Sequence, residues 1–329
     1  MRTLFSAQND ARRRSRHVTT MDGRGKGGSP SFAAGKGGRG KGGSSSGRVD
    51  APLLNSWLSK ATSADALLRL FAEHGSSMDS FHFGNLWNKL GKQLKSWSSQ
   101  RVDASKLDEL ATTTATQIGK CGAQQLANIA AGAANVGLLK SASAATLFGA
   151  IANAAPAHVN SPRCEARHLA NLAWGFATAS QRAPSLFDLL ASASAPRLQS
   201  DFNAQELAMT IWAFAKMEHG GVTREVASAA RARADDLEAQ SLATITLSLV
   251  KLDCKDGKAL KALAKAARKR MTEFNAQDLD NVASAYARLG KPRWGARLTI
   301  AIADSGVARL QGNGNGNGSG GWQQQQQQQ

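Results

Sequence analysis

The stretch Asn203-Ala-Gln-Glu-Leu-Ala-Met-Thr-Ile-Trp-Ala-Phe-Ala-Lys216 decides the fold class. Its apolar residues recur at spacings of three and four, the period of one face of an α-helix. Asn203 is a good helix N-cap, and Glu206, three residues later, completes a capping box. Phe202 and Leu207 stand where a hydrophobic staple packs across the helix start. The stretch therefore predicts a helix that starts after Asn203 and buries one face.

Similar stretches return along the chain. Residues 275–288 repeat the pattern with Asp278 in place of the glutamate. The first apolar positions of the copies are Phe83, Leu126, Leu169, Leu207, Leu242 and Leu279. A period of 35 to 43 residues is typical of a solenoid of helix pairs. The segments between copies predict second helices over 183–193, 222–237 and 260–271. We therefore predict an all-α solenoid of stacked antiparallel helix pairs, because one pair cannot bury its apolar face alone.

The composition divides the chain into three parts. Residues 1–50 form a tail rich in Arg, Gly and Lys, in which the hexamer Gly-Arg-Gly-Lys-Gly-Gly occurs twice. Residues 51–306 carry the helical-repeat array, and residues 307–329 form a Gly/Asn/Gln tail. Both tails have too little apolar surface to offset their chain entropy, so we predict that they are disordered. The arginines among the first residues also suit a mitochondrial transit segment.

The charge of the chain favours a polyanionic partner. The formal net charge is +17, and the first fifty residues contribute eleven Lys and Arg against three Asp. The remaining 279 residues keep a net charge of +9. A basic body with a more basic tail suits nucleic acid, although the same charge could serve solubility alone. No run of eighteen apolar residues occurs, so we expect no membrane span.

The cations of one predicted helix share a face. The separations of Lys258, Lys261, Lys265 and Arg268 are three, four and three residues, while Leu260 and its apolar neighbours form the opposite stripe. Such a face can contact phosphates, and the alternative is a solvated surface. The candidate RNA-binding residues are Lys258, Lys261, Lys265 and Arg268 in the body and Arg24, Lys26, Arg39 and Lys41 in the tail.

The tryptophans could stack bases, but most of them fit the core better. Trp87, Trp174, Trp212 and Trp294 are the candidates. Trp174 and Trp212 lie inside apolar stripes, which favours packing. The residues expected to be buried are Leu169, Trp174, Phe176, Leu207, Trp212, Phe214, Leu279 and Tyr286.

No pattern of catalytic or metal-binding residues is found. The chain has no P-loop, no His-Glu-x-x-His pair and no Cys-x-x-Cys pair. Cys121, Cys164 and Cys254 lie far apart, which favours packing over zinc or disulfides. His168 precedes an apolar helix core and suits packing or capping. We therefore expect no enzyme, no catalytic residue, no metal and no cofactor.

The signature Leu-Ala-Asn-x-Ala-Trp-x-Phe-Ala at Leu169 to Ala177 resembles a known group of repeats. It is similar to the octotricopeptide-type repeats of organelle proteins and to the arrays of FAST-kinase-like and RAP-domain proteins. It also resembles the subunit-six family of the trypanosomatid RNA-editing substrate-binding complex. The resemblance covers residues 63–306. It implies RNA binding in organellar, above all mitochondrial, RNA processing, stability or translation.

The expected partner is RNA, in single-stranded form, together with other ribonucleoprotein subunits and no membrane. The alternative function is a protein-interaction scaffold of the armadillo or HEAT type, whose basic charge would face acidic partners. Besides the mitochondrion, a plastid, the nucleus and the cytoplasm stay open as compartments.

Overall fold

The computed structural model describes residues 50–96, 103–138, 141–290 and 296–312. Within these ranges the regular structure comprises fifteen α-helices and five short 3-10 helices, and no β-strand occurs. The predicted all-α repeat fold is confirmed. The tails at 1–49 and 313–329, where disorder is predicted, lie outside the described residues. The last helix runs to Gly312, past the residue at which the sequence analysis ended the array.

Each repeat is a pair of helices, called A and B here. The A helices are α4 (Ser80–Ser96), α6 (Ala123–Asn135), α9 (Ala166–Ala179), α11 (Ala204–Lys216), α13 (Ala239–Lys251) and α15 (Ala276–Arg288). The B helices are α5 (Ala104–Gln117), α7 (Ala142–Ala154), α10 (Pro184–Ser194), α12 (Thr223–Ala232), α14 (Gly257–Lys269) and α16 (Ala296–Gly312). The pair α2 (Ala51–Lys60) and α3 (Ala64–His74) precedes them, and the short helix α8 (Pro156–Val159) follows α7.

The predicted second helices are present with shifted bounds: those expected over 183–193 and 260–271 are Pro184–Ser194 and Gly257–Lys269. The helix expected over 222–237 ends at Ala232, and a 3-10 turn over Ala234–Asp236 follows it. Similar turns follow α3, α5, α10 and α14. Four of the six B helices, α5, α10, α12 and α14, are therefore followed by one 3-10 turn before the next A helix.

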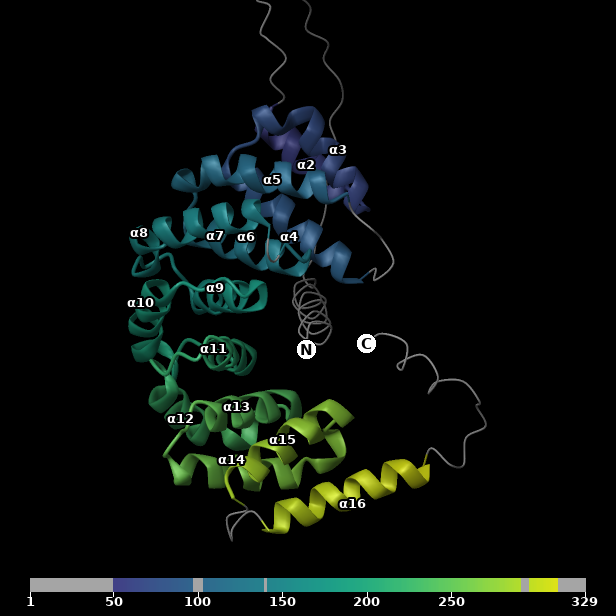
Figure 1. Ribbon diagram of the computed structural model, residues 1–329, viewed down its shortest axis with the longest axis vertical. Coiled ribbons are helices and arrows are strands. Elements are labelled where there is room, and N and C mark those ends of the chain that lie inside the picture. Colours follow the sequence, from purple (N-terminus) through teal and green to yellow (C-terminus); the bar gives the residue numbers. More distant parts are fainter. Residues whose placement is uncertain (1–49, 97–102, 139–140, 291–295, 313–329) are drawn as a thin grey trace, which may run out of the picture. The chain divides into compact units, whose positions relative to one another are not determined.

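The chain forms two compact units, residues 1–154 and 155–329. In the first unit, α2 packs on α4, α4 on α6, and α5 on α7. In the second unit, α9, α11, α13 and α15 pack in chain order, as Figure 1 shows, and α12, α14 and α16 do the same. Within each unit, A helices therefore contact A helices and B helices contact B helices, as in a solenoid.

Local hydrogen bonds fix the start of the A helices. Asn203 Oδ1 accepts from the amide of Glu206 at 2.9 Å, and Glu206 Oε2 accepts from the amide of Asn203 at 2.9 Å. Asn275 and Asp278 form the same reciprocal pair at 2.9 and 3.4 Å. Both predicted capping boxes are confirmed, and they satisfy amides that a helix start leaves unpaired.

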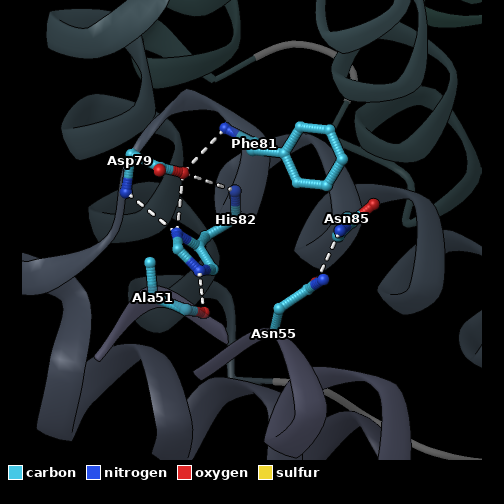
Figure 2. A network of polar contacts seen from close by, with 6 residues as sticks. All are labelled: Ala51, Asn55, Asp79, Phe81, His82 and Asn85. Carbon is cyan, nitrogen blue, oxygen red and sulfur yellow. Dashed lines mark hydrogen bonds and ion pairs between the residues drawn. The ribbon is translucent and has the colours of Figure 1, made fainter. Parts of the chain in front are cut away.

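Histidine takes the place of glutamate in the box of α4 (Figure 2). Nδ1 of His82 lies 2.7 Å from Asp79 Oδ1, and Nε2 lies 2.9 Å from the carbonyl oxygen of Ala51. One turn further on, the side-chain amide of Asn85 donates to Asn55 Oδ1 at 2.8 Å. The contact of His82 with Ala51 and that of Asn85 with Asn55 both join α4 to α2. The capping position therefore also ties one A helix to the preceding helix pair.

A buried apolar residue precedes the cap of every A helix. These residues are Met78, Cys121, Cys164, Phe202, Leu237 and Phe274. Two of the three cysteines thus pack where other repeats use phenylalanine or leucine. Burial raises the pKa of the Cys121 thiol to about 11. The packing interpretation of these cysteines agrees with the structure.

Seven of the eight residues expected in the core are buried. The exception is Trp212, which is half-buried and lies under the Lys216 ammonium, 5.2 Å from the ring centre. The prediction of an enclosed ring was wrong at this position. Trp87 and Trp174 are buried, and Nε1 of Trp87 donates to Thr114 Oγ1 at 2.9 Å. Trp294 lies outside the described residues.

Candidate nucleic-acid interface

The helix α14 separates its apolar and charged residues onto two faces. Asp256 caps the helix by accepting from the amide of Ala259 at 2.9 Å. Leu260 and Leu263 are buried, and the hydroxyl of Tyr286 on α15 donates to the Leu260 carbonyl at 3.0 Å. Burial raises the pKa of this phenol. The buried face of α14 packs on α12 and α13, so the opposite face must carry the cations into solvent.

Four of the five cations of α14 line a groove of about 400 Å³ beside α16. Leu298 of α16 lies in its wall and is buried. A fifth cation, Arg297, reaches the same groove from α16. We call the set Lys258, Lys261, Lys265, Arg268 and Arg297 the basic groove. All five side chains are exposed, and none of the described residues that line the groove is acidic. The structure therefore brings together the four predicted body residues and adds one.

Within the described part of the chain, four of the five cations of α14 form no hydrogen bond or ion pair: Lys258, Lys261, Lys265 and Arg268. Neighbouring cations are engaged instead. Lys269 Nζ lies 2.8 Å from Asp235 Oδ1, and Lys255 Nζ lies 2.6 Å from Asp253 Oδ2. The Lys269 ammonium lowers the pKa of Asp235, with a smaller contribution from Lys265. The basic groove thus holds cations that the fold leaves available to a ligand.

The ends of the B helices carry arginines with a structural role that the sequence analysis missed. Arg233 donates to the carbonyls of Phe202 at 2.7 Å and Leu198 at 3.2 Å. Arg270 donates to the carbonyls of Leu237 at 2.9 Å and Asp235 at 2.6 Å. Arg197 donates to the Cys164 carbonyl at 2.8 Å. We call these residues the arginine clasps.

Their spacing could have revealed the clasps. Successive clasps are 36 and 37 residues apart, which matches the repeat period. Each binds the carbonyl of the buried residue before an A helix. Arg270 is therefore committed to the fold, although it belongs to the same basic segment as α14.

The other sequence-predicted residues have no described position. Arg24, Lys26, Arg39 and Lys41 lie in the stretch 1–49, outside the described residues. Arg297 was missed because it belongs to no copy of the A-helix pattern, and only packing places it beside α14.

Among the described residues, no group of three or more His, Cys, Asp or Glu side chains could hold a metal ion. None of the described helices has the length and apolarity needed to cross a membrane. What the basic groove can do is accept closely spaced negative charges, such as successive phosphates, without displacing an internal ion pair.

The model of the RNA-editing substrate-binding complex 6 protein family matches residues 95–303. The match covers more than half of the chain. The chain belongs to this family. All five residues of the basic groove lie within the matched range, whereas α2 and α3 lie before it. No curated protein matches the chain significantly.

Membership in the RNA-editing substrate-binding complex 6 family agrees with one part of the sequence resemblance and places the chain among RNA-processing proteins. The match does not extend to octotricopeptide or FAST-kinase-like arrays. That part of the resemblance stays a statement about repeat pattern alone.

Proposed function

We propose that this chain binds single-stranded RNA as a non-catalytic subunit of a mitochondrial ribonucleoprotein complex. The observation that carries the proposal is the basic groove, five exposed cations in one groove of a chain whose family is described by RNA editing. Cations without internal partners contact phosphates with little rearrangement, and they release counterions from the RNA.

The geometry favours a positioning role for the groove. Phosphate contacts hold a strand in place and carry no sequence information. Single-stranded RNA is the proposed form because side chains recognise unpaired strands far more readily than the deep groove of an RNA duplex. The Arg/Gly-rich tail at 1–50 adds sequence-independent affinity in this proposal.

A salt titration of RNA affinity tests the proposal on the full-length chain. The variant changes Lys258, Lys261, Lys265 and Arg268 to Gln. If each contacts one phosphate, the slope of log K against log salt becomes shallower by about 0.7 per lost contact. Binding should weaken equally for strands of different sequence, because phosphate contacts do not read bases.

Two controls make the titration specific. Changing Lys106, Lys120, Arg163 and Arg182 to Gln removes the same charge from exposed positions elsewhere. Deleting residues 1–49 removes the tail alone. The proposal is wrong if the control variant matches the groove variant. It is also wrong if the deletion abolishes binding while the groove variant behaves as wild type, and the array would then be a protein scaffold.

A further inference from the structure

A second groove lies between α2 and α3, in the first unit and before the residues that the family model matches. Its volume is about 430 Å³, and Trp57, Lys60, Arg69 and Leu70 line it with Glu73. Trp57 is half-buried, so part of its indole faces the groove. We call this the Trp57 groove.

The indole of Trp57 is held from one side by a second aromatic ring. The second ring is that of His74, at the end of α3. The centres of the two rings are 5.2 Å apart, and the angle between the ring planes is 37°. Such a contact restricts the rotation of a large side chain before any ligand binds. The groove therefore offers an aromatic surface whose orientation is already set.

Contacts from α4 fix the chain segment that forms one rim. Nζ of Lys89 donates to the carbonyl of Leu58 at 2.8 Å and to that of Ser59. The side-chain amide of Gln93 donates to the Ala61 carbonyl at 3.1 Å. Burial lowers the pKa of Lys89, whose ammonium lies at the negative end of the α2 dipole. The end of α2 is thus satisfied internally, and the Trp57 groove keeps its shape without a ligand.

Two cations at the Trp57 groove have no internal partner. Lys60 and Arg69 are exposed, and within the described residues neither forms a hydrogen bond or an ion pair. Among the described lining residues the one acidic side chain is Glu73, whose Oε2 lies 3.7 Å from Nε2 of His74. An aromatic face flanked by two available cations matches a nucleotide, whose base stacks and whose phosphates are anionic.

We propose that the Trp57 groove binds one unstacked base of single-stranded RNA, with Lys60 and Arg69 contacting the phosphates on either side. The choice of RNA rests on the proposed function of the chain, while the site itself is separate from the basic groove. Stacking on an indole tolerates any base and favours purines through their larger ring. The groove would thus add base stacking to a chain whose other proposed site contacts phosphates.

The test measures the affinity of the full-length chain for oligoadenylate, with an RNA duplex of the same length beside it. Trp57→Ala should weaken oligoadenylate binding about tenfold, since stacking contributes about 1–3 kcal/mol per base. Trp57→Phe should keep most of the affinity. Neither change should alter the salt slope, because stacking releases no counterions. Duplex binding should be unaffected, since its bases are not available.

The cations are tested by the pair Lys60→Gln and Arg69→Gln. This variant should flatten the salt slope by about 0.7 per lost contact. Its matched control, Lys106→Gln with Lys120→Gln, removes equal charge from exposed residues of the same unit. A control with the same effect would overturn the assigned contacts.

Photocrosslinking of thiouridine-containing RNA, followed by mass spectrometry, locates the bound base without any substitution. Crosslinks within residues 57–74 are expected. The inference is wrong if wild type binds RNA but no crosslink falls there and Trp57→Ala binds normally. In that outcome the basic-groove variant can still lose affinity, and the proposed function stands. If wild type binds no RNA, the proposed function itself fails.

Discussion

The buried ring of His168 accepts a hydrogen bond at the start of a helix. It occupies the third position of α9, where Nδ1 accepts from the amide of Glu165 at 3.1 Å. The side chain is buried. Desolvation lowers the pKa of His168, and the neighbouring Arg167 lowers it further. The neutral ring is therefore the form that the fold uses, and protonation at Nδ1 would remove the acceptor.

This arrangement predicts a stability loss in mild acid. The folded-state pKa of His168 lies below the value of about 6.5 of an unfolded chain, so the unfolded state takes up the proton first. The free energy of unfolding should be full above about pH 6.5 and fall as the pH drops towards the lowered pKa. His168→Gln keeps an acceptor, as Gln125 does in α6 at 3.2 Å from the Gly122 amide, and should reduce this loss. Urea unfolding at about pH 5 and about pH 7.5 measures it. Identical pH dependence in both proteins would assign the effect elsewhere.

The sequence could identify the residues whose role depends only on their near neighbours in the chain. Asn203 and Asn275 could be read as caps because a capping box spans four residues of chain. Trp212 could not be placed from its own stripe, because exposure five residues after Leu207 depends on neighbouring repeats. The equivalent positions did not decide it either. Three copies hold the small or polar residues Asn88, Ala131 and Ser284, whereas the other two hold Leu247 and the buried Trp174.

At the scale of elements, an arginine clasp should stabilise the junction between two B helices. Arg233→Met leaves the carbonyls of Phe202 and Leu198 without their charged donor. The free energy of unfolding should fall by about 1–3 kcal/mol, the usual cost of an unpaired buried polar group. Arg224, which is exposed and forms an ion pair with its neighbour Glu225, is the control. Arg224→Met should change stability by less than about 0.5 kcal/mol. Equal losses in the two variants would show that the hydrogen bonds of Arg233 add nothing specific to stability.

The α4–α6 pair depends on glycine at its closest point. A Cβ on Gly132 would collide with the backbone carbonyl of Trp87, and one on Gly91 would lie 2.9 Å from Gly132 Cα. A backbone atom cannot move aside as a side chain can, so Gly132→Ala should force the two helices apart. The free energy of unfolding should fall by about 1–3 kcal/mol.

Gly149 in α7 provides a matched control for this substitution. It lies in the same unit, is exposed, and a Cβ there would meet nothing within 4 Å. Gly149→Ala should therefore stabilise by up to about 1 kcal/mol through helix propensity. Denaturant unfolding of both variants checks the opposite signs, and a loss in both would refute the packing argument.

Element pairing was predictable, whereas contact distance was not. The repeat period gave the A and B helices because each copy carries its own cap and apolar stripe. The close approach at Gly132 depends on a residue 45 positions away, Trp87, and no local pattern reports it. The 3-10 turns after the B helices were missed for a related reason, since a helical period does not distinguish the two helix types at a terminus.

At the scale of the whole molecule, the candidate site was predictable only in part. The spacing of Lys258, Lys261, Lys265 and Arg268 already placed them on one face. That they line a groove follows from α16, and Arg297 joins them only through tertiary packing. The Trp57 groove was missed because Trp57 lies outside the copies of the A-helix pattern, in a helix whose role becomes visible beside α3.

Repeat packing also predicts which helices a destabilising substitution affects. Each unit has its own buried core, and within a unit each helix pair contacts its neighbours. In such arrays stability is a sum of local terms. Gly132→Ala should therefore accelerate amide exchange in α4 and α6. Exchange in α11 and α13 should keep its wild-type rate.

The reciprocal variant is Leu242→Ala in α13, which removes a fully buried side chain at a cost of about 2–5 kcal/mol. It should accelerate exchange in α11, α13 and α15, which pack in that order, and leave α4 and α6 protected. Hydrogen–deuterium exchange read by mass spectrometry on both variants measures this, because opening free energies differ between regions. If either substitution lowered protection uniformly across both units, the molecule would unfold as one cooperative body and local additivity would not hold.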